Sequence, residues 1–254
     1  MIPIKKGSDI DGMRKSCRAV SEILDQLVTL VQPGVTTGEL DAEAARLIKA
    51  LGGKSAFFGY RGFPGHICAS VNEEVVHGIG GPRRLAYGDI IKLDVGILLD
   101  GWVGDTALTV PVGAVAQEID QLLQRTEASL YLGIEKARAG NRLGDICAAI
   151  EKHVTGGGYS VVREFVGHGV GRKLHEEPQI PNFGKAGTGP LLKPGMTLAI
   201  EPMVNMGKCG VKILKDGWTV VTCDLEPSAH FEHTVLVTEE DPEILTCRKV
   251  RAYK

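Results

Sequence analysis

The stretch "VGHGVGRKLHEEP", residues 166–178, sets the main constraint on the fold, because it carries His168 and His175 seven residues apart among several glycines. Glycines at this density disfavour a helix. An odd separation would place the two side chains on opposite faces of a straight strand. Either only one histidine acts chemically, or a bent loop brings both to one site in different roles.

An earlier stretch of the chain resembles this one, since "VVHGIG" at 75–80 matches "VGHGVG" at 166–171. Two further matches follow in the same order. "LAYGDIIKLD" at 85–94 matches "LKPGMTLAIE" at 192–201, and "DGW" occurs at 100–102 and again at 216–218. A single match could be a chance recurrence of a glycine turn. Three matches in order predict an internal duplication, with halves about a pseudo-two-fold axis and a site between them.

Charge and cysteine usage narrow the class of protein. The formal net charge is −2, which does not favour a nucleic-acid partner. The chain has no apolar run long enough to cross a membrane, and its start, "MIPIKKGSDIDGMRK", lacks the apolar core of a signal peptide. The six cysteines form no C-x-x-C pair, which is typical of free thiols in a reducing compartment. We expect a cytoplasmic protein without a nucleic-acid or membrane partner.

Hydrophobic periodicity predicts helices, then strands, then helices, then strands. Helices are expected over 8–31, from the capping pair Thr36 and Glu39 to about residue 52, over 117–138 and over 143–154. Strands are expected between 66 and 110 and between 160 and 238. This order predicts one α+β domain over 1–254 with antiparallel sheets and helices outside. We divide it into a helical segment 1–55, a first half at about 56–155 and a second half at about 156–254.

The segment "LDVGILLDGWVGD", residues 93–105, places Asp94 and Asp105 on either side of Asp100-Gly101. Asp-Gly between apolar runs predicts a hairpin with a two-residue turn. Gly96 then lies opposite Asp105, and the two aspartates become diagonal neighbours on one face, about 7–8 Å apart at the backbone. A three-residue loop would instead place them on opposite faces.

Buried carboxylates at these positions favour a metal site. Glu201 in "LAIEPM" and Glu232 in "AHFEHTVLV" are also embedded in apolar strands. One such acid could simply pair with an arginine or lysine. Several together repel each other without a cation. Carboxylates with an imidazole suit Mn²⁺, Fe²⁺, Co²⁺ or Zn²⁺, and four carboxylates could hold two metals that share bridging ligands, as in aminopeptidases.

Six segments together resemble one known family over nearly the whole chain. They are "YRGFPGHICASVNEEVVHGI" (60–79), "KLDVGILLDGWVGDTALT" (92–109), "GHGVGRKLHEEPQIPNFG" (167–184), "GMTLAIEPM" (195–203), "DGWTVVT" (216–222) and "SAHFEHTVLVT" (228–238). The chain resembles methionine aminopeptidases of type I, which are metallopeptidases with the pita-bread fold. The resemblance implies that α+β fold, duplicated about a pseudo-two-fold axis, with a dinuclear metal site between the halves.

The resemblance also implies a ligand set. Its members are Asp94, Asp105, His168, Glu201 and Glu232. By the same resemblance Asp105 and Glu232 bridge two divalent ions, Asp94 binds one ion, and His168 and Glu201 bind the other. The ions could be cobalt, manganese, iron, zinc or nickel.

The function implied is removal of the N-terminal methionine from proteins and peptides with a small second residue. Glu201 is expected to accept and pass on a proton while water attacks the first peptide carbonyl. His175 should hydrogen-bond the carbonyl oxygen as it becomes negative, and His77 should contact the scissile amide nitrogen. The expected partners are nascent polypeptide N-termini close to the ribosome, and the enzyme is expected to be a monomer.

The resemblance implies an apolar pocket for the methionine side chain. Its expected lining is Phe57, Tyr60, Phe63, Cys68, Leu174 and Trp218. Leu174 stands where the family usually has Phe, and Phe57 and Phe63 stand where it often has Cys and Tyr. Gly80 stands where Pro is frequent. These departures affect the shape of the pocket and leave the expected reaction unchanged.

Two other functions remain open. The first is a related pita-bread peptidase of the prolidase or Xaa-Pro aminopeptidase type, although those relatives carry a large additional N-terminal domain. Here only about 65 residues precede the first strand motif. The second is a catalytically inactive binding protein on the same fold. Such a protein would lack some of the ligands, and none is missing here.

Overall fold

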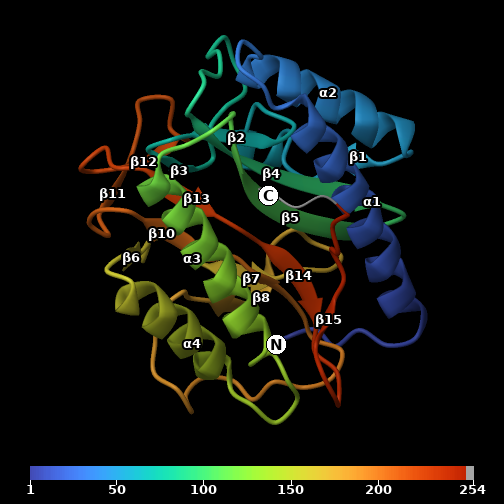
Figure 1. Ribbon diagram of the computed structural model, residues 1–254. Helices are drawn as coiled ribbons and strands as arrows, with labels where there is room; N and C mark the ends of the chain where they lie inside the picture. The colour runs from blue at the N-terminus through green and yellow to red at the C-terminus, as the bar shows by residue number, and fades with distance from the viewer. Residues whose placement is uncertain (250–254) are drawn as a thin grey trace.

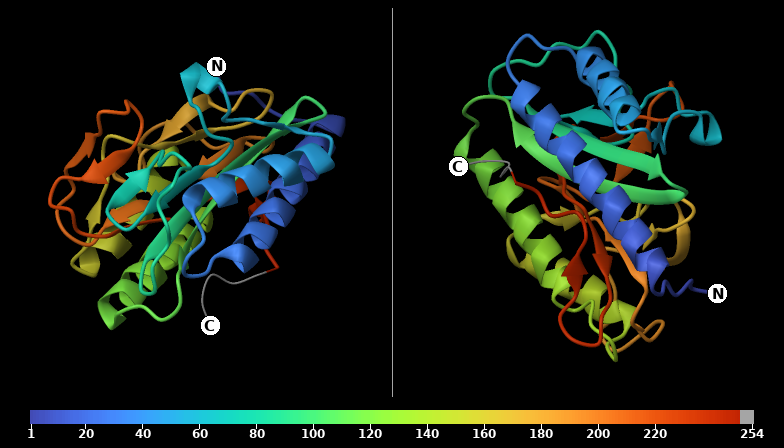
Figure 2. Two further views of the ribbon diagram at one scale, coloured as in Figure 1. Left: turned by 90° about the horizontal axis from the view of Figure 1, so that it is seen from above. Right: turned by 90° about the vertical axis from the view of Figure 1, so that its right-hand side faces the viewer.

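Figure 1 shows the computed structural model of the chain, which describes residues 1–249. The helices are α1 (Ser8–Leu30), α2 (Thr37–Ala50), α3 (Gln117–Ile134) and α4 (Leu143–Gly156), with a short 3-10 turn η1 (Tyr60–Gly62). They lie on the outside of the strands, and Figure 2 shows α1 lying across one face of the longest hairpin. No helix within 1–249 combines the length and apolar character that a membrane span needs.

The strands form antiparallel sheets. The first sheet contains β1 (Lys54–Ser55), β2 (Cys68–Val71), β4 (Ile90–Leu99) and β5 (Trp102–Pro111). The largest contains β7 (Gly167–Gly169), β8 (Glu176–Ile180), β9 (Thr197–Ile200), β14 (His233–Leu236) and β15 (Glu243–Ile244). One small sheet contains β6 (Ser160–Val161), β10 (Met203–Asn205) and β13 (Ser228–His230). Another contains β3 (Glu74–Val76), β11 (Val211–Ile213) and β12 (Val220–Thr222). The predicted α+β class with antiparallel sheets is confirmed.

The first two helices follow their sequence signals closely. α1 buries a stripe at helical spacing that includes Met13, Cys17 and Leu24. Thr36 and Glu39 form the predicted capping box, because the Glu39 amide donates to the Thr36 hydroxyl at 3.1 Å and the Thr36 amide donates to the Glu39 carboxylate at 2.7 Å. The cap removes two unpaired donors from the start of α2.

The pattern 160–167 predicts a continuous strand, and here the prediction is wrong. Only β6 forms, and the chain is irregular from there to β7. Val162 still donates its amide to the Met203 carbonyl, at 3.0 Å, but Phe165 and Val166 line an internal cavity. A strand ladder would hold this segment flat in a sheet, whereas the cavity requires it to bend inward.

One of the three internal matches marks equivalent structure. The segments 85–94 and 192–201 both turn at a left-handed glycine, Gly88 with φ 92° and Gly195 with φ 87°, and then lead into β4 and β9. Asp94, within β4, and Glu201, directly after β9, therefore reach comparable places in the two halves. The duplicated halves of the predicted fold depend on this match.

The other two sequence matches, "VVHGIG" with "VGHGVG" and the two "DGW" segments, do not occupy equivalent positions in the two halves, so that part of the prediction is wrong. The segment 167–169 is β7 and pairs directly with β9, whereas 77–80 lies beside β2, where the Ala69 amide donates to the Gly78 carbonyl at 2.8 Å. The first "DGW" closes the hairpin of β4 and β5, but the second lies between β11 and β12. Glycine-rich turns recur for local reasons, and such recurrence does not define a repeat.

The boundaries 1–55, 56–155 and 156–254 stay a prediction, and residues 250–254 lie outside the described residues.

The two large sheets join where β5 meets the start of β14. The Thr106 hydroxyl donates to the Glu232 carbonyl at 2.8 Å, and the Thr234 hydroxyl donates to the Asp105 carbonyl, also at 2.8 Å. The Glu232 amide donates to the Ala107 carbonyl at 2.9 Å. These bonds place the backbone of Asp105 beside that of Glu232.

We expect Gly104→Ala to destabilise the fold by about 1–3 kcal/mol, the usual cost of an overpacked position. A methyl group there would lie inside contact distance of the Ser16 and Cys17 backbone of α1. Urea denaturation of both proteins measures the change. Gly156→Ala is the matched control, because a Cβ at that helical position has nothing within 4 Å. Equal stability of Gly104→Ala and the unchanged protein would contradict the close packing of α1 on β5.

Candidate metal centre and substrate pocket

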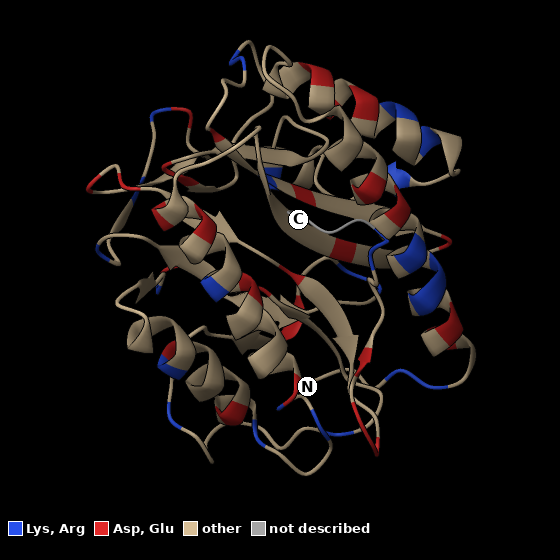
Figure 3. Cartoon of the chain, viewed as in Figure 1, with Lys and Arg blue, Asp and Glu red and all other residues tan. Residues whose placement is uncertain are grey.

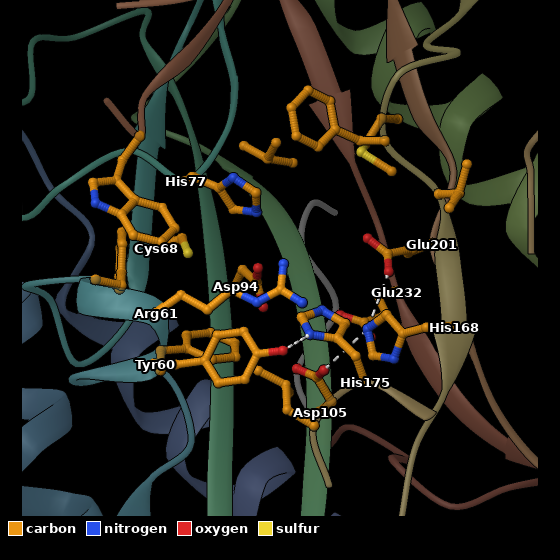
Figure 4. Close-up of a pocket in the computed structure, with 18 residues that line it drawn as sticks. Tyr60, Arg61, Cys68, His77, Asp94, Asp105, His168, His175, Glu201 and Glu232 are labelled. Atoms are coloured by element: carbon orange, nitrogen blue, oxygen red, sulfur yellow. Dashed lines mark hydrogen bonds and ion pairs between the residues drawn. The ribbon is translucent and has the colours of Figure 1, made fainter. Parts of the chain in front are cut away.

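All the predicted site residues line one cavity of about 270 Å³ (Figure 4). They are Phe57, Tyr60, Phe63, Cys68, His77, Asp94, Asp105, His168, Leu174, His175, Glu201, Trp218 and Glu232. Figure 4 shows His168, Glu201 and Glu232 together at one side of the cavity, with Cys68 and His77 at the other and Asp94 between them. The volume is slightly below the roughly 300–1,000 Å³ of sites for drug-sized ligands. It therefore suits a single amino-acid side chain with its reacting groups.

The turn between β4 and β5 places the two aspartates on one face. Asp100 and Gly101 have φ angles of 50° and 78°, so both central residues are left-handed, as a two-residue hairpin turn requires. In the resulting register Gly96 faces Asp105, as predicted, and Asp94 lies two residues along on the same side. Figure 3 shows acidic positions on long strands as well as on the outer helices.

The glycine opposite Asp105 makes room for the aromatic wall of the cavity. A Cβ on Gly96 would lie 2.5 Å from an edge carbon of the Phe57 ring. The ring therefore occupies the space that a side chain at 96 would need. Phe57 itself is 8% exposed, and its backbone amide donates to the Ser55 hydroxyl at 3.1 Å.

The glycines around His168 let neighbouring strands approach its backbone. A Cβ on Gly167 would collide with the Ala199 carbonyl of β9, and one on Gly169 would collide with the Glu177 carbonyl of β8. His168 Nδ1 lies 3.0 Å from the Gly169 carbonyl oxygen, so Nδ1 carries the proton. The Nε2 lone pair is then free to face the carboxylates.

His168 lies among the buried carboxylates at distances that suit a shared cation. Its Nε2 is 3.5 Å from Glu201 Oε1 and 3.7 Å from Asp105 Oδ2. One donor atom each from Asp105, His168 and Glu232 lies within 4.8 Å of the others. This carboxylate and imidazole donor set suits a divalent transition metal.

Three buried carboxylate oxygens in this cluster have no hydrogen-bond partner within the described chain: Asp94 Oδ1, Asp105 Oδ1 and Glu232 Oε1. A buried polar atom without a partner costs stability. A cation at the cluster would satisfy all three. The residues present therefore fit a metal site.

Burial and mutual repulsion shift the protonation equilibria of the cluster. Burial raises the pKa of Asp94 to about 7 and that of Glu201 to about 8. Burial first, and then the neighbouring carboxylates, raise the pKa values of Asp105 and Glu232 well above the ordinary range. Burial also lowers the pKa of His168 to about 3, so the ring is a neutral ligand at neutral pH. A bound cation would reverse the shifts of the carboxyls, because it favours their charged forms.

The bend after residue 170 brings His175 back to the same cavity. The His168 and His175 rings lie 4.3 Å apart between centroids, and His175 Nδ1 is 2.7 Å from the Tyr60 hydroxyl (Figure 4). If the phenol donates to Nδ1, as a neutral phenol does to an imidazole lone pair, the remaining proton of the ring is on Nε2. The structure thus brings both histidines of the segment 166–178 to one site.

His77 faces the cavity from a strained backbone position, with φ at 60°. A left-handed conformation at a residue other than glycine is costly and often occurs at functional sites. Its ring meets the Phe165 ring edge-on at 5.4 Å and the Trp218 ring at 6.3 Å. Burial lowers the pKa of His77 to about 4.

Aromatic rings line the apolar end of the cavity. Phe63 and Trp218 pack edge-to-face with centroids 5.1 Å apart. The cavity is also lined by residues that sequence reasoning missed: Arg61, Val76, Phe165, Val166 and Met203. Arg61, Val76, Val166 and Met203 lie within the motifs quoted above, and Phe165 directly precedes one. Their place in or beside a motif was their only signal in the sequence.

Comparison with known proteins identifies the class. A model of metallopeptidase family M24 matches residues 11–239, and the chain belongs to this family. It is similar to methionine aminopeptidase 1 of Bacillus subtilis, with 51% identity over 97% of this chain and 99% of the relative. It is also similar to the methionine aminopeptidase of Clostridium perfringens, with 50% identity over 98% of this chain and all of the relative.

The fold of the chain also matches the folds of solved structures. The crystal structure of methionine aminopeptidase from Rickettsia prowazekii is 43% identical and superposes with a TM-score of 0.96, over 97% of this chain and 100% of that chain. The prolidase from Pyrococcus horikoshii OT3 is 20% identical with a TM-score of 0.80, and the match covers 98% of this chain and 65% of the prolidase. The second likeness shows the fold alone. Both confirm the predicted pita-bread fold.

We expect metal removal to destabilise the protein more at pH 8 than at pH 6. The carboxyl pKa values are raised in the folded chain above the value of about 4 in an unfolded chain. Stability of the metal-free protein is therefore lost as the pH rises from about 4 through the folded pKa values, about 7 for Asp94 and about 8 for Glu201. Each kcal/mol lost lowers the thermal midpoint by about 2–4 °C.

The measurement is thermal unfolding of chelator-treated protein at the two pH values, with Mn²⁺ restored as the control. Metal should raise the midpoint at both pH values and remove most of the difference between them. The same pH dependence with and without metal would contradict a cation site at these carboxyls.

Proposed function

We propose that this protein is a metal-dependent aminopeptidase that removes the N-terminal methionine from proteins and peptides with a small second residue. One observation carries the proposal: the cavity joins a buried cluster of carboxylates and His168 to an aromatic pocket. The cluster suits hydrolysis of a peptide bond, and the pocket suits one apolar side chain. The similarity to methionine aminopeptidases over nearly the full chain supports the same substrate class.

We propose two divalent ions per chain, held by Asp94, Asp105, His168, Glu201 and Glu232. Asp105 and Glu232, whose backbones the β5–β14 junction places side by side, are assigned as the shared ligands. Ions bound there would supply Lewis acidity and make a water molecule nucleophilic at neutral pH. The donor set accepts cobalt, manganese, iron, zinc or nickel.

Glu201 is assigned as the group that takes the proton of the attacking water and passes it to the leaving amine. His175 would donate its Nε2 proton to the carbonyl oxygen as negative charge develops there. His77, across the cavity, would contact the scissile amide nitrogen. The lowered pKa values of His77 and His175 keep both rings neutral, so each acts by hydrogen bonding.

The pocket for the methionine side chain is formed by Phe57, Tyr60, Phe63, Cys68, Leu174 and Trp218. Thioether sulfur makes favourable contacts with the edges of aromatic rings. The edge-to-face pair of Phe63 and Trp218 presents such edges. The cavity of about 270 Å³ must also hold the reacting peptide bond, which leaves little room for a large second side chain.

A second cavity, of about 550 Å³, continues from the first and shares His168, His175 and Arg61 with it. It provides a path for the remainder of a polypeptide substrate. The similarity to methionine aminopeptidases supports nascent polypeptide N-termini as partners. We further propose that the enzyme meets them close to the ribosome in the cytoplasm and acts as a monomer.

Two alternatives are less supported. The relatives of about 50% identity are methionine aminopeptidases, whereas the prolidase from Pyrococcus horikoshii OT3 is only 20% identical. An inactive binding protein would lack metal-binding side chains, but all five candidates line the cavity.

The substrate proposal predicts that Met-Ala-Ser is cleaved roughly 100-fold or more faster than Met-Leu-Ser, because a misfitting side chain costs about this factor. Release of free methionine from both peptides, with Mn²⁺ or Co²⁺ present, measures the ratio. Ala-Pro is the control substrate for a proline-specific peptidase. Comparable rates on Met-Ala-Ser and Met-Leu-Ser would contradict the small-residue requirement, and cleavage of Ala-Pro alone would favour the prolidase alternative.

The division of roles predicts different losses for the two histidines of the segment 166–178. His168→Ala should lower both bound metal and kcat. His175→Ala should keep metal content near that of the unchanged enzyme and lower kcat by roughly 10²–10³-fold, the scale for one oxyanion donor. Metal analysis beside turnover, with His153→Ala on the outer helix α4 as control, tests this. Equal metal loss in both variants would show that the roles are not divided.

A further inference from the structure

His230 is a buried histidine at the site whose role the proposed mechanism does not include. It ends β13, and its side chain is 1% exposed. Its backbone is held from both sides by Thr109 of β5, whose hydroxyl donates to the His230 carbonyl at 2.7 Å and accepts the His230 amide hydrogen at 2.9 Å. The ring therefore has little freedom to move away from the cluster.

The sheet register directs this ring at Glu201. His230 pairs with Met203 of β10, and Glu201 lies two residues before Met203. His230 Nε2 is 3.3 Å from Glu201 Oε2. The other oxygen of the same carboxylate, Oε1, is the one 3.5 Å from His168 Nε2. Glu201 thus has one oxygen towards the proposed metal ligand and the other towards His230.

In the described part of the chain, Glu201 is the one carboxylate within 4.0 Å of a ring nitrogen of His230. Neither ring nitrogen of His230 makes a hydrogen bond there that meets strict geometry, and the charges of Asp94 and Lys92 also act on the ring. Contacts in active sites are often long before substrate binds and tighten in the complex. The Glu201 backbone is anchored separately, because Asn182 Nδ2 donates to its carbonyl at 3.0 Å.

We propose that His230 is a positioning residue for Glu201: its Nε2–H hydrogen-bonds Glu201 Oε2 and so aims Oε1 at the metal centre. This inference rests on the proposed function, in which Glu201 is both a ligand and the proton acceptor. Ligand carboxylates are commonly held by such outer hydrogen bonds, and removing one typically weakens metal binding or activity by about 10- to 100-fold. His230 does not contact the substrate in this arrangement.

The test compares His230→Gln with His230→Leu. The glutamine amide can donate from nearly the same place as Nε2, whereas leucine fills similar volume without a donor. Calorimetric titration of metal-depleted protein with Mn²⁺ measures the affinities of the ions, and thermal unfolding confirms that each variant is folded. Turnover of Met-Ala-Ser gives kcat and KM separately. Since the metal titration needs no substrate, it decides the inference even if the proposed function fails.

We expect His230→Leu to weaken one ion by about 10- to 100-fold and to leave the other nearly unchanged, because Glu201 is assigned to one ion only. Its kcat should fall with little change in KM, and His230→Gln should restore most of both losses. Unchanged affinities and kcat in His230→Leu would overturn the proposal. Equal partial losses of metal affinity and kcat in the two variants would also overturn it, because they would indicate a purely structural role. Complete loss of one ion in both variants would overturn it as well, because it would make His230 itself a ligand.

Discussion

The junction of β5 with the start of β14 is the constraint on which the rest of the site depends. Two hydroxyl-to-carbonyl bonds, from Thr106 to Glu232 and from Thr234 to Asp105, connect positions 126 and 129 residues apart in the chain. Each such bond contributes only about 0.5–1.5 kcal/mol net. Together they hold two buried carboxylates side by side, an arrangement that their mutual repulsion opposes.

The electrostatics of the cavity follow from that arrangement. Without a cation, burial and neighbouring acids raise the carboxyl pKa values, and the imidazoles stay neutral. A cation converts the same groups into charged ligands, so metal binding and folding stability are linked. The aromatic wall at the other side of the cavity carries no charge, which separates recognition of a side chain from the chemistry at the peptide bond.

Several features of the fold and site could be predicted from short-range pattern. The Asp100-Gly101 turn, the shared face of Asp94 and Asp105 and the capping of α2 all depend on a few neighbouring residues. The same reasoning failed where two similar short motifs were taken to occupy equivalent positions in the two halves of the fold. The repeated "DGW" closes different hairpins, because a turn motif specifies its own hairpin and not its place in a sheet.

The sequence by itself determined which side chains share a face of a strand, since the alternation of a hairpin is fixed once its turn is known. It also carried the family resemblance that named the candidate ligands. Only the tertiary structure decided that Glu201 lies between His168 and His230, and that His175 returns to the cavity beside Tyr60. Those distances depend on how separate sheets and a bent loop pack together, and local periodicity contains no information about that packing.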